Sequence, residues 1–205
     1  MPCNPAVGGT GKDHLVRELD ALGGEMARAA DAACIQYRML NLGKGPAVHS
    51  LRAQADRRKY QEVMKRTLER QERLRLIQAE VVDIGVEDGR VVSVTTHTGA
   101  VWRCGAAVVA TGTFLKGRTI VGEVIRDSGP DGLAPSGPLA ERLRELGLSL
   151  RRFKTGTPPR INARSVDFSK MQVQEGDAEP EPFSFQTETP PVNRARCWLT
   201  YTNER

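Results

Sequence analysis

Two segments of the chain place apolar side chains at the spacing of an amphipathic helix. The first covers residues 13–37, and we expect it to break or bend at Gly23-Gly24, because adjacent glycines interrupt a helix. Its apolar side chains form one stripe, which we expect to face the core. The stripe consists of Leu15, Leu19, Leu22 and Met26.

The second helical segment covers residues 55–73 and surrounds its apolar stripe with basic side chains. The stripe contains Tyr60, Val63, Met64, Thr67 and Leu68. The basic residues are Arg57, Arg58, Lys59, Lys65, Arg66, Arg70 and Arg73. Their face either follows an RNA backbone or is solvated. The glutamates interleaved with them favour the solvated interpretation.

From residue 74 onward the apolar period changes to that of β-strands. The pairs Asp88-Gly89 and Thr98-Gly99 favour tight hairpin turns, so consecutive strands should form a β-meander. The expected strands cover residues 74–79, 81–87, 90–97 and 100–103.

A continuous apolar run follows at residues 105–112. Such a run is typical of a strand that is buried on both faces of a parallel sheet. Ligands of open α/β sheets gather at the carboxyl ends of these strands, where Ala110, Thr111 and Gly112 would lie. Gly112 either lets a cofactor approach the backbone or only begins a turn.

Two later segments complete the pattern. Ser136 precedes a short helical pattern at residues 139–146, and its hydroxyl either caps that helix or binds a ligand. Residues 171–196 are rich in Glu, Gln, Pro and Thr, which predicts a long extended segment or a domain insertion. Phe183 and Phe185 are its expected apolar anchors.

Composition narrows the class of protein. Of the 205 residues, 39% are hydrophobic and 27% are charged, which is ordinary for a globular chain. The longest apolar run, residues 106–110, is too short to span a bilayer, so we expect no membrane segment. The four cysteines lack CxxC spacing, and we therefore expect no metal site and a cytoplasmic location. The net charge of +5 weakly indicates a polyanionic partner.

The first residues combine a thiol with a glycine-rich loop. A helix that begins near Asp13 would favour an anion in this loop and would stabilise a thiolate at Cys3. Alternatively, the loop is an ordinary turn and Cys3 is a small buried apolar residue. The glycines that allow close backbone approach are Gly8, Gly9 and Gly11.

Two further loops carry basic side chains. Lys44, within the loop at residues 42–51, either meets a phosphate or is a solvated residue of a connection. Residues 151–160 place four basic side chains around Phe153 and a double proline. This second segment is a moderate indication of nucleic-acid binding.

Five sequence blocks follow one another along the chain: Cys3–Gly9, Lys44–Val48, Arg52–Arg57, Ala110–Leu115 and Lys154–Arg160. Taken together and in this order, they closely resemble the MnmG family, which is also called GidA. The resemblance continues to Thr202-Asn203-Glu204 and so covers essentially the whole chain. Members of this family are flavoproteins that modify tRNA wobble uridines.

The resemblance implies an α/β fold with an incomplete FAD-binding, Rossmann-like domain of the two-dinucleotide-binding type. This domain with its β-meander would cover residues 1–155, and an inserted α/β domain would begin at residues 156–205. The implied reaction adds an aminomethyl or carboxymethylaminomethyl group at uridine position 5. FAD, NADH as reductant and methylenetetrahydrofolate as carbon donor take part, and the GTPase MnmE is the partner. The full-length protein is expected to be a homodimer.

The resemblance also assigns residues. Cys3 occupies a catalytic cysteine position and acts as the nucleophile that adds to the uracil ring, as an acid/base group, or as a support for the flavin. The expected flavin contacts are Val81, Ala110, Thr111, Gly112 and Ser136. The residues expected near the nicotinamide and tRNA surfaces are Lys154, Thr155 and Arg160.

The sequence also departs from the family pattern. The first strand and the GxGxxG loop of the family should precede Cys3, so we expect an internal fragment that binds FAD weakly or not at all and is inactive. Two alternatives stay open. One is a folate- and FAD-dependent uridine methyltransferase of the tRNA T-loop, and the other is a noncatalytic basic RNA-binding module.

Overall fold

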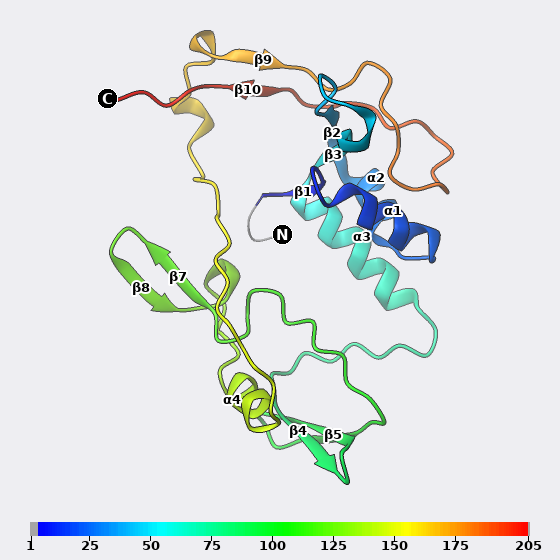
Figure 1. Cartoon of the computed structure of the whole chain (residues 1–205), viewed down its shortest axis with the longest axis vertical. Coiled ribbons are helices and arrows are strands. Elements are labelled where there is room, and N and C mark those ends of the chain that lie inside the picture. Colours follow the sequence, from blue (N-terminus) through cyan, green and yellow to red (C-terminus); the bar gives the residue numbers. More distant parts are fainter. Residues whose placement is uncertain (1–3, 205) are drawn as a thin grey trace. The chain divides into compact units, whose positions relative to one another are not determined.

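The computed structural model describes residues 4–204 of the chain. These residues form two compact units (Figure 1). The first unit combines the chain up to Arg75 with the chain from Gly156 onward, and the second comprises Leu76–Thr155. The division predicted from the sequence, into a cofactor domain and an inserted domain, refers to the domains of the family. The two compact units do not test it, so it stays a prediction.

An antiparallel three-stranded sheet with the strand order β1-β3-β2 forms the centre of the first unit. Its strands are β1 (Ala6–Gly8), β2 (Cys34–Leu40) and β3 (Ser50–Ala55). The helices are α1 (Asp13–Ala21), α2 (Met26–Ala33) and α3 (Arg57–Arg70), with single 3-10 turns at Pro46–Val48, Ala163–Ser165 and Phe168–Lys170. A second antiparallel pair consists of β9 (Gln172–Gln174) and β10 (Cys197–Leu199).

The core of the first unit brings a distant segment onto this sheet. Phe183 is fully buried, and its ring centroid lies 6.3 Å from that of the buried Tyr37. Gly8 must remain a glycine, because a Cβ there would overlap the Phe183 ring and the Leu51 carbonyl oxygen. The other members of the core are Val7, Val16, Ala27, Ala30, Cys34, Leu51 and Ala53.

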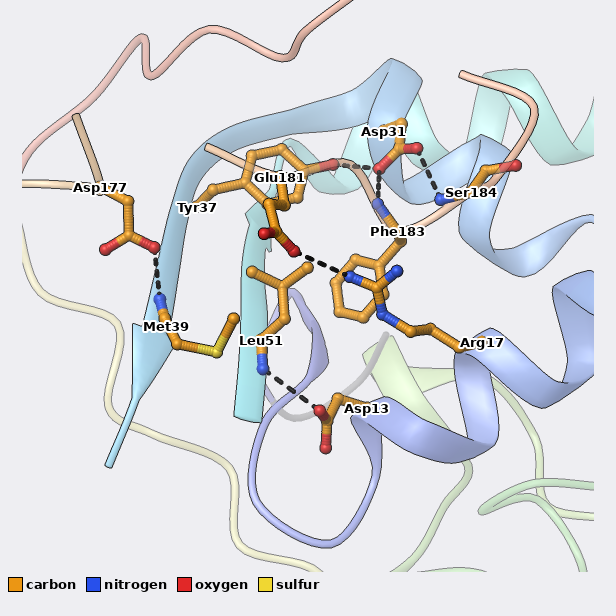
Figure 2. Close-up of polar contacts among 10 residues, drawn as sticks. All are labelled: Asp13, Arg17, Asp31, Tyr37, Met39, Leu51, Asp177, Glu181, Phe183 and Ser184. Atoms are coloured by element: carbon orange, nitrogen blue, oxygen red, sulfur yellow. Dashed lines mark hydrogen bonds and ion pairs between the residues drawn. The ribbon is translucent and has the colours of Figure 1, made fainter. Parts of the chain in front are cut away.

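Two aspartates of the helical region hold the segment around Phe183 in place. The Asp31 carboxylate accepts hydrogen bonds from the backbone N–H groups of Phe183 and Ser184 at 2.8 and 3.0 Å, and from the Tyr37 hydroxyl (Figure 2). The buried Asp20 carboxylate accepts from the Ser184 hydroxyl at 2.8 Å. These bonds satisfy charges that would be costly to bury alone.

The free edge of β2 is also covered by the C-terminal part of the chain. The Asp177 carboxylate accepts a hydrogen bond from the Met39 N–H at 2.5 Å (Figure 2). The Asn193 side chain accepts from the Tyr37 N–H at 2.7 Å. The Ile35 carbonyl accepts from two further backbone N–H groups of this segment. Residues 171–196 are therefore an extended segment that is tied to the sheet.

The helix expected at residues 13–37 is instead two helices followed by a strand. The break at Gly23-Gly24 is confirmed, since Gly23 has a φ of +86° and the Gly24 N–H donates to the Leu19 carbonyl at 2.8 Å. The expectation for residues 34–37 is wrong. Cys34 adopts an extended conformation with a ψ of 140°, and β2 begins there because it pairs with β3.

The prediction that the apolar stripe of residues 13–37 faces the core is wrong as well. Its members are more than a third exposed, and Leu22 reaches 87%. The buried residues of α1 are Val16 and Asp20. From the sequence alone, an aspartate is expected to face solvent. Here the Ser184 hydroxyl and the Phe185 N–H donate hydrogen bonds to the Asp20 carboxylate, and these bonds offset the cost of its burial.

Helix α3 confirms the amphipathic helix expected at residues 55–73. The Asp56 carboxylate caps its N-terminus by accepting from the N–H groups of Arg58 and Lys59. Tyr60 packs against the core with its apolar neighbours half-buried. Two of the basic residues pair with glutamates one turn away, Lys65 with Glu69 and Arg66 with Glu62, which supports the solvated interpretation.

The second unit contains a β-meander, a hairpin and one helix. The meander is β4 (Val81–Glu87), β5 (Arg90–Thr96) and β6 (Val101–Arg103) in sequential order, as the alternation predicted. The hairpin pairs β7 (Arg118–Val121) with β8 (Val124–Asp127). Helix α4 (Pro138–Glu145) confirms the short helix after Ser136, and a 3-10 turn covers Pro130–Gly132.

A small apolar cluster joins the meander to α4. Ile84, Leu139 and Leu143 are its buried residues. The Arg142 guanidinium ties the helix to β4, because its Nε and Nη2 atoms lie 3.1 and 3.0 Å from the Ile84 carbonyl oxygen and Nε also lies 2.6 Å from Asp83. The packing of α4 against the meander therefore depends on a few side chains.

Two strands expected in the second half of the pattern are absent from the described residues. Residues 74–79 are extended and exposed without a strand partner. Residues 105–112 are also exposed coil, and Val108 is 93% exposed. A strand buried on both faces needs neighbours on two edges and two covering layers, and none of the strands of this unit pairs with this run.

Candidate functional site

The turn that follows Thr111 is the best-defined part of the expected flavin-contact region. The Phe114 N–H donates to the Thr111 carbonyl at 3.0 Å, and Gly112 adopts a φ of +55° inside this turn. A second tight turn follows, in which Lys116 has a φ of +45° and the Gly117 N–H donates to the Phe114 carbonyl at 3.0 Å. Non-glycine residues rarely adopt such a conformation, so surrounding contacts must hold Lys116 there.

Ser136 supplies those contacts, although it follows Thr111 by many residues. Its N–H donates to the Phe114 carbonyl at 3.0 Å, and its carbonyl accepts from the Lys116 N–H at 2.7 Å. Leu115 and Ser136 thereby form an isolated parallel bridge. The structure thus brings Thr111, Gly112 and Ser136 into one small hydrogen-bonded region.

The Ser136 hydroxyl does not cap α4. The helix has Gly137 as its N-cap residue, without a hydrogen bond from a capping side chain, and Pro138 in its first turn. The first N–H groups of α4 therefore have no side-chain acceptor there. Ser136 is half-buried, and the ligand-binding interpretation of its hydroxyl stays a prediction.

A charge network lies beside this region. The Lys116 ammonium pairs with the Glu141 carboxylate, and Arg144 donates to the same carboxylate at 2.7 Å. These hydrogen bonds, that of Lys116 first, lower the pKa of Glu141. Sequence inspection missed the pair, because 25 positions separate the two residues and neither stands in a motif.

Val81 belongs to the same unit and to the same apolar cluster. It opens β4, where it pairs with Thr96 of β5. Val81 and Leu115 both pack against the cluster around Leu139. The structure therefore connects Val81, through shared packing, to the turn that carries Thr111 and Gly112.

Ala110 lies just before this turn, in the exposed coil. An open hollow of about 1020 Å³ lies alongside the start of that coil, and none of the expected flavin contacts lines it. Its lining residues are Arg90, Val91, Val92, Arg103, Cys104, Gly105, Ala106 and Ala107. The apolar coil and the hollow form a surface that the described residues leave open to solvent.

The residues expected near the nicotinamide and tRNA surfaces are exposed and lie in irregular backbone. Lys154 and Thr155 end the second unit, whereas Arg160 belongs to the first. Their assignment stays a prediction.

Cys3 lies outside the described residues. The chain that follows it turns at Asn4, whose carbonyl accepts the Ala6 N–H at 2.8 Å, and enters β1. The loop after β1 closes when the Lys12 and Asp13 N–H groups donate to the Gly9 carbonyl at 2.9 and 3.1 Å. Helix α1 then begins at Asp13 as expected.

Three other cysteines are described, and each is a free thiol. Burial raises the pKa of the Cys34 thiol to about 12, so this residue stays protonated near neutral pH. The Cys197 thiol is half-buried and donates a hydrogen bond to the Gln36 side-chain oxygen at 3.0 Å. Cys34 is therefore unsuited to nucleophilic catalysis.

Residues 4–204 contain neither a metal-ligand cluster nor a membrane-spanning helix. No three side chains of the His, Cys, Asp and Glu types gather closely enough to hold a metal ion in this range. The helices of the same range are all too short or too polar to cross a membrane.

The whole chain, residues 1–205, matches the family described as glucose inhibited division protein A. A relative from Caldicellulosiruptor saccharolyticus is 59% identical over 204 residues, and one from Geobacillus kaustophilus is 55% identical over 204 residues. Both bear the name "tRNA uridine 5-carboxymethylaminomethyl modification enzyme MnmG". These alignments cover 100% of this chain and 33% and 32% of the relatives.

The structure is also similar to that of a solved protein, again over only part of that protein. Two crystal forms of Aquifex aeolicus GidA are 46% identical in sequence, with TM-scores of 0.90 and 0.91. Each comparison covers 97% of this chain and 34% of that protein. The chain therefore spans about a third of the length of the relatives it matches.

Proposed function

The chain belongs to the glucose inhibited division protein A family, and on that premise we propose that its protein is an FAD-dependent enzyme of tRNA wobble-uridine modification. The proposed reaction adds an aminomethyl or carboxymethylaminomethyl group at uridine position 5. Methylenetetrahydrofolate is the proposed carbon donor, and NADH is the proposed reductant. The single observation that carries this proposal is the match over all 205 residues, since similarity along the whole of this chain is more specific than any one motif.

The region around Thr111 fits a dinucleotide cofactor. A Cβ built on Gly112 has no atom within 4 Å, so the backbone there is open to a ligand. Pro138 has no N–H, and the Ala140 N–H donates to the Gly137 carbonyl at 3.0 Å. The Leu139 N–H and the Ser136 hydroxyl are therefore the donors at the start of α4 that no capping side chain occupies. We propose that Val81, Ala110, Thr111, Gly112 and Ser136 hold FAD, which supplies electrons when it is bound.

The residues of the chain have distinct roles in this proposal. Thr111 and Ser136 orient the cofactor through a region that the Phe114 and Lys116 backbone bonds keep rigid. Cys3 either adds its thiolate to the uracil ring, which activates the ring, or transfers a proton to it. Lys154, Thr155 and Arg160 contribute to the nicotinamide or tRNA surface.

The partners follow the same premise. We propose tRNA as the substrate and the GTPase MnmE as the protein partner, with a homodimer as the assembly and the cytoplasm as the location. The charge of +5 agrees with an RNA substrate. A noncatalytic RNA module would leave the turn at Gly112 without a role.

Mass spectrometry of tRNA nucleosides tests the proposal. A strain that lacks the gene for this sequence should lose the modified wobble uridine and keep the methylated T-loop uridine. Loss of the T-loop methyl group alone would favour the methyltransferase alternative. An unchanged nucleoside profile would contradict both enzymatic functions and favour the RNA-binding module.

A further inference from the structure

Two arginines face each other on the sheet of the first unit, on the side away from its core. Arg38 of β2 lies directly opposite Arg52 of β3 in the strand register. The neighbouring pairs are Tyr37 with Ala53 and Met39 with Leu51. All four residues belong to the core around Phe183 or pack against it, and Figure 2 shows Tyr37, Met39 and Leu51 beside Phe183. Because side chains alternate along a strand, Arg38 and Arg52 share the opposite face.

Like charges in direct opposition destabilise a sheet, and no carboxylate among the described residues pairs with either arginine. The Arg38 guanidinium donates to a backbone oxygen, the Glu175 carbonyl, at 2.6 Å. The Glu175 carboxylate pairs with Arg196 at 2.9 Å instead. The Arg52 guanidinium makes no hydrogen bond or ion pair within residues 4–204, and its Nε atom is buried without a partner.

Two aspartates outside these strands hold the backbone next to the arginines. The Asp13 carboxylate accepts the Leu51 N–H at 3.3 Å, and the Asp177 carboxylate accepts the Met39 N–H at 2.5 Å. Both bonds fix the backbone of the core-facing positions. The positive charge of the arginine pair is therefore not neutralised by these two carboxylates.

The Arg52 side chain also lies against the glycine-rich loop. A Cβ on Gly9 would lie 3.9 Å from the Arg52 Cδ atom, and Gly9 has a φ of +86°. The following amides, those of Thr10 and Gly11, donate no hydrogen bond within the described chain. The Asn41 side chain fixes this loop to the end of β2 by donating to the Thr10 hydroxyl at 3.1 Å.

We propose that the Arg38–Arg52 pair, together with the Thr10 and Gly11 amides, binds a phosphate group. A guanidinium offers a planar fork of donors that matches two oxygens of a phosphate, and two forks suit a group with two negative charges. Backbone amides of a glycine loop add neutral donors without a steric barrier. This phosphate site lies in the first unit and does not depend on the proposed flavin contacts, all of which lie in the second.

Thermal unfolding of the 205-residue chain with inorganic pyrophosphate tests the site. Pyrophosphate should raise the Tm of the original chain but not that of Arg38→Gln or Arg52→Gln. Without pyrophosphate, each substitution should itself raise the Tm slightly, because it removes the repulsion. Arg126→Gln is the matched control, since Arg126 is an exposed strand arginine of β8, and it should keep the pyrophosphate effect.

Two larger probes identify the source of the phosphate. The Kd of a 12-nucleotide oligouridine and the Kd of FAD are measured with the original chain and with Arg52→Gln. The ligand that uses the site should bind roughly tenfold more weakly to Arg52→Gln than to the original chain. The Kd of Arg52→Lys should lie between those of the original chain and Arg52→Gln, because lysine keeps the positive charge but lacks the planar fork of donors.

The proposal is overturned by a pyrophosphate shift that is equal in Arg52→Gln and Arg126→Gln, by no shift in the original chain, or by an unchanged Kd for both larger probes. None of these outcomes bears on the nucleoside analysis that tests the proposed function. The two proposals therefore fail separately.

Discussion

The two units of this chain differ in how they bury apolar surface. In the first, side chains from positions as distant as Val7 and Phe183 enclose one core, and the buried Asp20 and the half-buried Asp31 satisfy the backbone of the segment that closes it. In the second, a small cluster around Leu139 supports a meander and a helix, while the apolar residues 105–110 are exposed. The first unit is therefore expected to unfold cooperatively through its core, whereas the second presents open apolar surface beside the proposed flavin contacts.

The largest expected effect is the loss of the Phe183 ring. Phe183→Ala should lower the unfolding free energy of the first unit by about 3–5 kcal/mol, because it empties a fully buried position. Phe185→Ala is the matched control. Phe185 is 69% exposed and contacts only the Arg17 guanidinium as a ring partner, so about 1 kcal/mol or less is expected. Urea denaturation measures both, and equal effects would contradict the asymmetry of the two rings.

The second unit should respond to its cluster and not to its exposed run. Leu139→Ala should destabilise this unit by about 2–3 kcal/mol, since Leu139 is buried against Ile84. Val108→Ala should change the free energy by about 0.5 kcal/mol or less, because Val108 is exposed. Hydrogen exchange of the β4 and β5 amides reports this unit separately. A larger loss of protection in the Val108 variant would show that residues 105–112 are buried after all.

The aspartate contacts of the first unit provide a smaller and more local test. Asp31→Asn should cost about 1–3 kcal/mol, because the amide cannot accept at both oxygens from Phe183, Ser184 and Tyr37. The loss of amide protection should centre on residues 183–187. The control is Asp88→Asn in the exposed β4–β5 turn, where φ is +48° and asparagine is tolerated. Unchanged protection in Asp31→Asn would remove Asp31 as the residue that holds this segment.

The smallest effect at neutral pH concerns the buried Cys34. Burial raises its pKa from 9.0 to about 12, so the folded state holds the thiol proton more tightly than the unfolded state does. The resulting stability is complete below pH 9 and declines as the pH rises from 9 toward 12. Unfolding free energies across this range should fall less steeply for Cys34→Ala than for Cys104→Ala. Parallel slopes would mean that Cys34 is not buried in the folded state.

The two units also differ in how far the sequence predicts them. Helix α3, helix α4 and the meander depend on local signals, such as the Asp56 cap and the Asp88-Gly89 turn, and these predictions are confirmed. The predictions that are wrong concern residues whose structure depends on partners far away in the sequence. Asp20 is buried because Ser184 reaches it, and residues 34–37 form a strand because β3 pairs with them.

The candidate site shows the same limit. The turn at Gly112 could be predicted from a glycine that ends an apolar run. Its contact with Ser136 could not, because backbone hydrogen bonds between residues 20 or more positions apart produce no pattern in the sequence of either segment. The arginine pair was equally hidden. Arg38 and Arg52 become a pair only through the register of β2 on β3.

The most direct test of the central claim, that the turn at Gly112 serves wobble-uridine modification, compares two glycines. Gly112 and Gly122 have φ values of +55° and +58° and open space around a built Cβ, so Gly112→Val and Gly122→Val impose similar strain. In strains whose only copy of the gene carries one substitution, tRNA nucleosides are quantified by mass spectrometry. Gly112→Val should reduce the modified wobble uridine roughly tenfold or more, while Gly122→Val should leave most of it. Equal levels of the modified uridine in the two strains would contradict the account.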